Sequence, residues 1–235
     1  MGKDISLTTK AYETIKKQIF DFNLLPGQTI SDYLLSKELN MSRTPIRQAL
    51  LRLENEGLIQ EQNGKKSYCV AEITKEDIQD LFDFREGIET TAFMLAYRKG
   101  ISQEQISILQ DITNKMKDTN ESGQAKEHFY YDQQFHNELV AFSQNKRLIK
   151  AHDEILLQLT RIRFLSFLEN SLQDKACIKH QAIIDAIKDN DYERGKQAII
   201  DHVRSSCTDF INLFGNGLSA QSLYLLRYFT EKSKT

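Results

Sequence analysis

Four side chains in the second half of the chain have the types and spacing of a metal-binding site. Asp132 and His136 lie four residues apart in one predicted helix, so both project from the same face. His180 and His202 follow in two later helices, each flanked by apolar residues. Neutral imidazole is the commonest protein ligand for transition metals, and an added carboxylate suits zinc, nickel or manganese. We expect zinc first, with coordination positions left open for water or an acidic ligand.

The spacing alone does not establish that these helices converge. Each histidine could instead be a partly exposed helix residue with one local hydrogen bond. Two further histidines, His128 and His152, have no partner at ligand spacing, and we expect them to be surface or helix-packing residues. No nucleophile motif or Gly-rich phosphate loop accompanies the carboxylates, so the residues favour binding over catalysis.

A second group of residues near the N-terminus suits contact with DNA. Arg43, Thr44 and Arg47 lie at the N-terminal end and on the outer face of a helix that Ser42 can cap. Arginine pairs in bidentate fashion with guanine, while the hydroxyls of Ser42 and Thr44 can donate to phosphate. The alternative is that these residues form an ordinary solvated helix face.

Three amphipathic helices and a hairpin are predicted to position this group. The first helix ends before Pro26-Gly27, Ser31 can cap the second, and the third ends at Gly57. The expected inner face of the second helix consists of Leu34, Leu35 and Leu39. Three helices followed by a hairpin predict a winged helix-turn-helix.

The hairpin is indicated by Asn63-Gly64 between the extended runs 58–62 and 67–71, because both turn positions tolerate positive φ. Lys65 and Lys66 follow the turn, where a wing would approach the DNA backbone or minor groove. We therefore add Gly64, Lys65 and Lys66 to the candidate DNA-binding residues.

Beyond Ala71 the pattern changes to long helices that must bury one another, which predicts an antiparallel α-helical bundle. The first begins at Thr74 or Lys75 and ends at Gly100, and Ser102 caps the next. Further apolar-periodic stretches cover 125–143, 146–170, 174–189 and 191–213. In the helix that ends at Gly100, the positions expected to face inward include Ile78, Phe82, Phe84, Arg85, Ile88 and Phe93. We predict a mainly α fold with domains at 1–73 and 74–214, and an extension at 215–235 that forms a packed helix.

The composition fits this division and excludes several classes of protein. Among 235 residues, 40% are hydrophobic and 27% charged, which is ordinary for a globular chain. Only 10 Gly and 2 Pro argue against a β-rich fold, and three widely spaced cysteines imply no disulfide framework. Residues 1–75 carry 11 Lys and Arg against 9 Asp and Glu, a slight basic excess. With no candidate membrane span or signal peptide, we expect a cytoplasmic protein.

The N-terminal residues resemble the DNA-binding domain of the GntR family of bacterial regulators. The match comprises Pro26-Gly27, the run Ser42-Arg43-Thr44-Pro45-Ile46-Arg47, Ala49-Leu50, Leu53-Glu54 and Glu56-Gly57-Leu58. The resemblance implies that Arg43 and Arg47 contact an operator and that Gly64 approaches the groove. Tyr33 is a departure, because some relatives carry Arg there.

The helical part resembles the FCD domain of the FadR branch of that family. The matching residues are Asp132 with Gln134, Phe135 and His136, then Asn145 and Leu148, then His180 with Ala182, Ile183 and Ala186, then Asp191 and His202. The resemblance implies that Asp132, His136, His180 and His202 are metal ligands. Arg85 and Glu89 match another motif region, and Arg85 is expected to point into the cavity and hold an acidic effector.

The resemblance implies a ligand-responsive transcriptional regulator, a repressor by the usual mode, and no enzyme. Its partners would be a small carboxylate, a pseudo-palindromic operator and a second copy of the chain in a homodimer. One alternative is a regulator for which the metal ion itself is the signal. Another is a metal-dependent hydrolase, which would need a general base near a metal-bound water and would leave the winged domain unexplained.

Overall fold

The computed structural model describes residues 6–21, 23–62, 67–72, 74–166 and 170–214. Within these residues the chain divides into two compact units, with the boundary between Thr74 and Lys75. No helix in the described ranges is long and apolar enough to cross a membrane. The expected packed helix at 215–235 lies outside the described residues.

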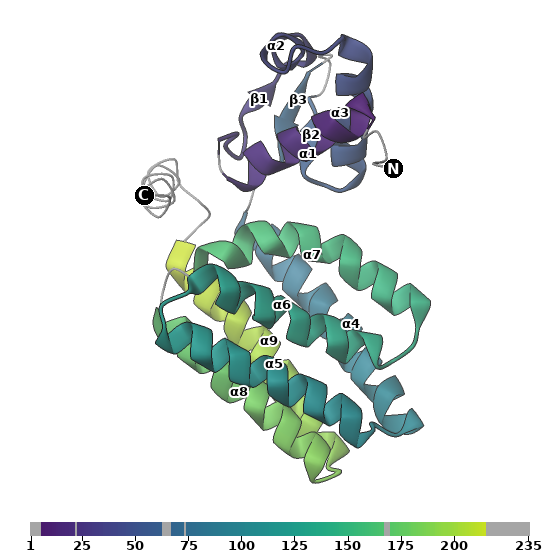
Figure 1. The fold of residues 1–235 in the computed structure, drawn as a ribbon, viewed down its shortest axis with the longest axis vertical. Coiled ribbons are helices and arrows are strands. Elements are labelled where there is room, and N and C mark those ends of the chain that lie inside the picture. The colour runs from purple at the N-terminus through teal and green to yellow at the C-terminus, as the bar shows by residue number, and fades with distance from the viewer. Residues whose placement is uncertain (1–5, 22, 63–66, 73, 167–169, 215–235) are drawn as a thin grey trace, which may run out of the picture. The chain divides into compact units, whose positions relative to one another are not determined.

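The N-terminal unit combines three helices with a small antiparallel sheet (Figure 1). Its strand order is β1-β3-β2, with Thr29 of β1 and Gln60 of β2 both opposite Cys69 of β3. The elements are α1 (Leu7–Phe20), β1 (Thr29–Ile30), α2 (Asp32–Glu38), α3 (Arg43–Asn55), β2 (Ile59–Glu61) and β3 (Tyr68–Val70). This arrangement confirms the predicted winged helix-turn-helix, although the hairpin turn at 63–66 lies outside the described residues.

The helix boundaries of this unit follow from local chemistry. The Ser31 side chain accepts a hydrogen bond from the Leu34 amide and so caps α2. Ser42 occupies the N-cap position of α3 but makes no side-chain hydrogen bond there with any described residue. Gly57 has a φ of 69°, a conformation that favours glycine and ends α3 as the sequence predicts.

The core of the unit lies between α1 and α3. It includes the fully buried side chains of Ile15, Ile46, Leu50 and Leu53. The prediction that Leu34 faces inward was wrong, because its side chain is 63% exposed while that of Leu35 is buried. Leu39, which is half-buried, lies about 40° around the helix from Leu35, whereas Leu34 lies about 100° from Leu35 in the opposite direction and so points to solvent.

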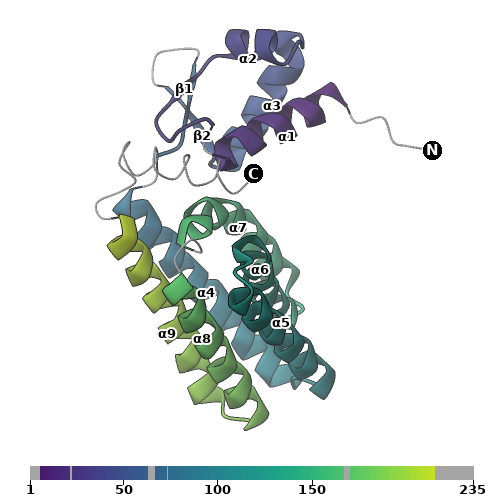
Figure 2. The same ribbon diagram turned by 60° about the vertical axis from the view of Figure 1, so that its left-hand side comes forward.

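The second unit is a bundle of six helices within the described residues. These are α4 (Lys75–Lys99), α5 (Gln103–Glu121), α6 (Ala125–Ala141), α7 (Lys146–Ser166), α8 (Asn170–Lys188) and α9 (Tyr192–Phe214). Helix α4 packs against α6, α7 and α9, while α5 packs against α6 and α8. Figure 2 shows α5 beside α6 and α8 beside α9. Short connections between these neighbours make each pair antiparallel, as predicted.

Helix α4 begins at Lys75, and Gly100 follows it with a φ of 86°. The Ser102 side chain and Gln105 form a capping box at the start of α5. Along α4, Ile78, Phe82 and Arg85 are buried as expected. The prediction for Phe84 was wrong: its side chain is 53% exposed, because the residue lies about 200° around the helix from the buried Phe82.

Candidate metal centre and nucleic-acid interface

Three histidines from three helices meet inside the bundle. The Nε2 atoms of His136 on α6 and His202 on α9 are 3.2 Å apart, and His180 Nε2 on α8 lies 3.2 Å from the former and 3.3 Å from the latter. All three side chains are buried. Asp132 Oδ1, one helical turn before His136, lies 3.9 Å from His136 Nε2 and 3.7 Å from His180 Nε2. The structure thus brings together all four residues that the sequence nominated.

The spacing of these atoms fits a first-row metal ion. A tetrahedral zinc ion holds histidine nitrogens at about 2.0–2.1 Å, which places neighbouring nitrogens about 3.3 Å apart. The three Nε2 atoms already have this separation. Asp132 is a few tenths of an ångström further out, within reach of a side-chain adjustment. The donor set therefore fits a divalent ion.

Hydrogen bonds on the far side of two of the rings direct their Nε2 lone pairs inward. His136 Nδ1 donates to Glu89 Oε2 at 3.0 Å, and His180 Nδ1 lies 3.3 Å from the Met116 sulfur on α5. The His180 ring is also stacked on Phe135, with centroids 4.0 Å apart. Such outer contacts fix the tautomer and orientation that a metal ligand needs. His202 Nδ1 is buried and has no hydrogen-bond partner among the described residues.

Arg85 lies at the edge of this centre and is only 1% exposed. Its Nε donates to Glu89 Oε1 at 2.5 Å, and its Nη2 donates to His136 Nε2 at 2.7 Å. Nη1 is buried without a hydrogen-bond partner in the described part of the chain. The guanidinium therefore uses the His136 lone pair that a metal ion would need, so Arg85 must turn away when an ion binds there.

Several residues of the centre were not assigned a role from sequence. Glu89 was named only as part of a motif, yet it holds both Arg85 and His136, and its Oε1 lies 3.9 Å from His152 Nε2. The signal available in the sequence was an acidic residue four positions after Arg85, on the apolar face of the predicted helix. His128 and His152 are both buried, so the surface alternative was wrong and the packing alternative was right.

The electrostatics of the centre keep the imidazoles of His136 and His202 neutral. Burial lowers the pKa of His136 to about 4, with Arg85 acting in the same direction and Glu89 opposing both. Burial and the neighbouring imidazoles of His180 and His136 hold the pKa of His202 well below its usual value. Burial alone would raise the pKa of Glu89, but Arg85 and His136 outweigh it and lower that pKa well below the ordinary value. At neutral pH, neutral His136 and His202 can each donate a lone pair to a metal ion, and the ionised Glu89 can orient the His136 ring.

We expect the metal-free protein to lose stability as the pH falls from about 6.5 to about 4. In that range His136 is protonated in the unfolded chain but stays neutral in the folded one, so the unfolded state gains protons and is favoured. The shift corresponds to about 3 kcal/mol for this residue. Glu89, whose pKa is also lowered, acts in the same sense at the acid end of the range.

Urea unfolding followed by circular dichroism, in chelator at pH 7, 6, 5 and 4.5, measures this loss. A His136→Gln variant serves as the control, because it should show a shallower decline. A midpoint that does not change between pH 7 and 5 would contradict the prediction.

The candidate DNA-binding residues of α3 lie where the sequence placed them. Ser42, Arg43, Thr44 and Arg47 are exposed at the N-terminal end of the helix, while Ile46 beneath them is buried. Gly64, Lys65 and Lys66 lie outside the described residues. Sequence reasoning missed the first residue of α2, Asp32, which accepts hydrogen bonds from both Arg43 and Arg47.

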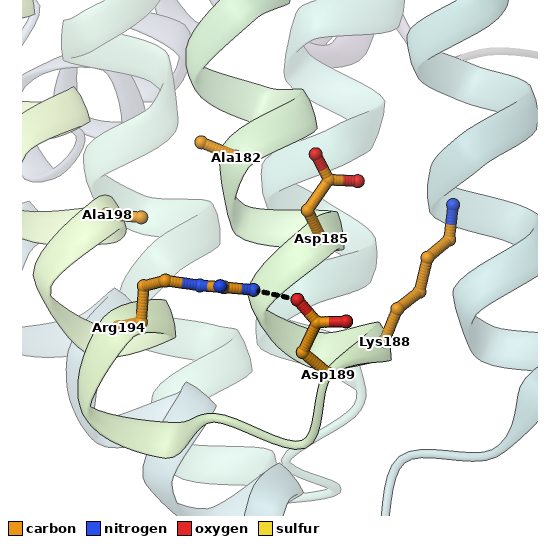
Figure 3. A pocket seen from close by; sticks show the side chains of 6 residues that line it. All are labelled: Ala182, Asp185, Lys188, Asp189, Arg194 and Ala198. Carbon is orange, nitrogen blue, oxygen red and sulfur yellow. Dashed lines mark hydrogen bonds and ion pairs between the residues drawn. The ribbon is translucent and has the colours of Figure 1, made fainter.

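A separate surface pocket between α8 and α9 has different chemistry (Figure 3). It measures about 480 Å³, and its lining consists of Ala182, Asp185, Lys188, Asp189, Arg194 and Ala198. Arg194 donates to Asp189 at 2.5 Å across it, so its cation is compensated by a neighbouring carboxylate. The buried Arg85, with one donor unused by the described residues, is therefore the stronger candidate for an anion.

A winged helix-turn-helix followed by a helical bundle with a buried histidine triad defines a class of two-unit transcriptional regulators. The chain matches the family described as bacterial regulatory proteins, gntR family, over residues 7–68, and the FCD domain family over residues 80–205. It belongs to the GntR family and carries an FCD domain. Both families consist of transcriptional regulators and not of enzymes.

Individual relatives agree with this assignment. The Nta operon transcriptional regulator of Aminobacter aminovorans is 29% identical over 185 residues, covering 78% of this chain and 84% of the relative. The HTH-type transcriptional repressor RspR of Escherichia coli is 24% identical over 193 residues, covering 82% and 84%. The solved structure of E. coli McbR/YncC has a TM-score of 0.71 at 19% identity, with 90% of this chain and all of that chain covered, and shows the same fold.

Proposed function

We propose that this DNA-binding transcriptional regulator holds a divalent metal ion at His136, His180, His202 and Asp132 and senses a small carboxylate there. The observation that carries the proposal is the mutual 3.2–3.3 Å spacing of three buried Nε2 atoms. Three nitrogens and one oxygen suit zinc, with nickel and manganese as alternatives. A metal ion bound by these four protein ligands can increase its coordination number, and the added coordination positions can accept oxygen ligands.

Charge balance supports an anionic effector. A divalent ion and the Arg85 guanidinium would together face two carboxylates, those of Asp132 and Glu89, which leaves one positive charge in a buried site. Burying an unpaired charge is costly, so a carboxylate ligand would stabilise the loaded centre. Arg85 Nη1, without a partner among the described residues, is the donor available to it.

On the DNA side, the proposed partner is a pseudo-palindromic operator bound by a homodimer. Two recognition helices would then meet successive major grooves about 34 Å apart. The regulator is proposed to act as a repressor, as the relative RspR is named. The effector must favour one conformational state of the protein over another, because equal affinity for both would shift nothing.

The test begins with elemental analysis of untagged protein purified without chelator, where we expect about one metal ion per chain. Calorimetric titration with acetate, malonate and citrate then asks which carboxylates bind. An Arg85→Met variant should keep its metal but bind the carboxylate roughly 10–100-fold more weakly, the effect of one charge-assisted hydrogen bond. Arg98→Met, at an exposed position of the same helix, is the matched control.

Three outcomes would change the proposal. A chain that takes up no metal even after reconstitution would reject the centre. Equal carboxylate affinity in Arg85→Met and in the wild type would remove Arg85 from the effector site. DNA release driven by the metal alone would favour the alternative in which the ion is the signal.

A further inference from the structure

Asp32 holds both arginines that the sequence assigns to DNA contact. Its carboxylate accepts from Arg43 Nη2 at 2.8 Å and from Arg43 Nε at 3.2 Å, and from Arg47 Nε at 2.6 Å. The side chain of Asp32 is 12% exposed, whereas those of Arg43 and Arg47 are 51% and 55% exposed. The carboxylate therefore lies beneath two guanidinium groups that extend into solvent.

The two arginines are held in different ways. Arg43 presents its Nε and Nη2 edge to Asp32, so the edge that could form a bidentate pair on that side is occupied. Arg47 is bound through Nε alone, so neither of its two terminal nitrogens donates to Asp32. Bidentate recognition of guanine O6 and N7 requires such a pair of donors. Both arginines therefore keep an end-on pair of terminal nitrogens, and Arg47 has more of its guanidinium free of Asp32 for contact with a base.

The carboxylate is also well placed to stay ionised. Asp32 is the first residue of α2, where the helix dipole favours a negative charge. Burial opposes ionisation, but the hydrogen bonds from Arg47 and Arg43 outweigh it and lower the pKa of Asp32. One negative charge is thus set against two positive ones at the surface that would meet DNA.

We propose that Asp32 is a positioning residue that sets the sequence specificity of this regulator, orienting Arg47 for base contact and restraining non-specific attraction to phosphate. The inference rests on the proposed DNA contacts of Arg43 and Arg47. Ion pairs with half-exposed arginines contribute little to folding stability, so we do not assign this cluster a purely structural purpose. Its consequence is expected in DNA binding, where both orientation and net charge matter.

The experiment compares Asp32→Asn with the wild-type full chain on two duplexes by fluorescence anisotropy. One is the duplex that wild-type protein selects from a random-sequence pool, and the other is a scrambled duplex of equal composition. The variant should bind the scrambled duplex several-fold more tightly, and the ratio of the two affinities should fall about tenfold. The dependence of log K on log salt should steepen by about one unit per protomer.

Two further variants separate orientation from charge. Asp21→Asn removes the carboxylate that pairs with Lys17 on α1, a contact that does not involve α3, and should leave the affinity ratio unchanged. Asp32→Glu keeps the charge and a carboxylate fork, and should restore most of the ratio. An Asp32→Asn ratio equal to that of the wild type, or of Asp21→Asn, would overturn the inference.

The outcome can be told apart from failure of the underlying DNA contacts. If Arg47→Ala keeps full discrimination between the duplexes, the proposed base contact fails. If Arg47→Ala loses discrimination while Asp32→Asn keeps it, only the role of Asp32 fails. A lower melting temperature of Asp32→Asn with equal losses on both duplexes would make the residue structural and would likewise overturn the inference.

Discussion

Replacing His180 with alanine should abolish stoichiometric metal binding. His180 Nε2 lies within 3.3 Å of the other two Nε2 atoms and 3.7 Å from Asp132 Oδ1. Its removal leaves only two imidazole nitrogens and one carboxylate as metal ligands. Loss of an outer contact already costs metal sites about 10–100-fold in affinity, and loss of a ligand should cost more than about 100-fold. Elemental analysis and competition with a chromophoric chelator measure the effect.

The same substitution should lower the melting temperature of the metal-loaded protein, because metal binding to the folded state adds to its stability. His128→Ala is the matched control. It also removes a buried histidine of the bundle, but the His128 side chain donates to the Met116 carbonyl instead of joining the triad. His180→Ala protein that retains one metal ion per chain would reject the proposed centre.

Arg47→Ala should weaken binding to the selected duplex by about 1–3 kcal/mol, or roughly 5- to 150-fold, the range of a good bidentate contact with a base. Binding to scrambled DNA should change much less, because Arg47 is proposed to bind a base edge that only the selected sequence presents. The Arg47 side chain is 55% exposed at the recognition end of α3, so the fold should tolerate its removal. Anisotropy titrations at a fixed salt concentration measure both affinities.

Arg52→Ala provides the comparison on the same helix. Arg52 lies about 140° around the helix from Arg47. Its guanidinium lies over the Tyr12 ring, 3.6 Å from the ring centroid, and pairs with Glu56. We expect it to leave discrimination between the duplexes intact. Equal losses on selected and scrambled DNA for Arg47→Ala would reduce its role to a phosphate contact.

Features that depend on neighbouring residues in the sequence were predictable. The Ser31 and Ser102 caps, the glycine that ends α3 and the start of α4 at Lys75 follow from local backbone chemistry. The choice between adjacent side chains was less secure. Leu34 and Phe84 are apolar, yet each lies beside a residue that occupies the inward position, and only packing against other elements decides between them.

Features that depend on contacts between distant elements were harder to reach. The ligand types at 132, 136, 180 and 202 could be named, but their convergence required the packing of α6, α8 and α9. The pairing of Asp32 with Arg43 and Arg47 was missed because these partners lie 11 and 15 residues away on another helix. Periodicity shows which face a residue occupies and not what that face will meet.

The centre receives a side chain from every helix of the bundle that the structure describes, since Glu89 and Arg85 come from α4, Met116 from α5 and His152 from α7. Helix α4 has a further connection, because it starts at Lys75, immediately after the boundary of the DNA-binding unit. About ten residues of continuous helix, about 15 Å, separate that boundary from Arg85. Arg85, which is proposed to bind the effector, and Lys75, which follows the DNA-binding unit, are thus two residues of one continuous helix. Under the proposed function, a shift of α4 at the centre would reach Lys75 without passing through a loop.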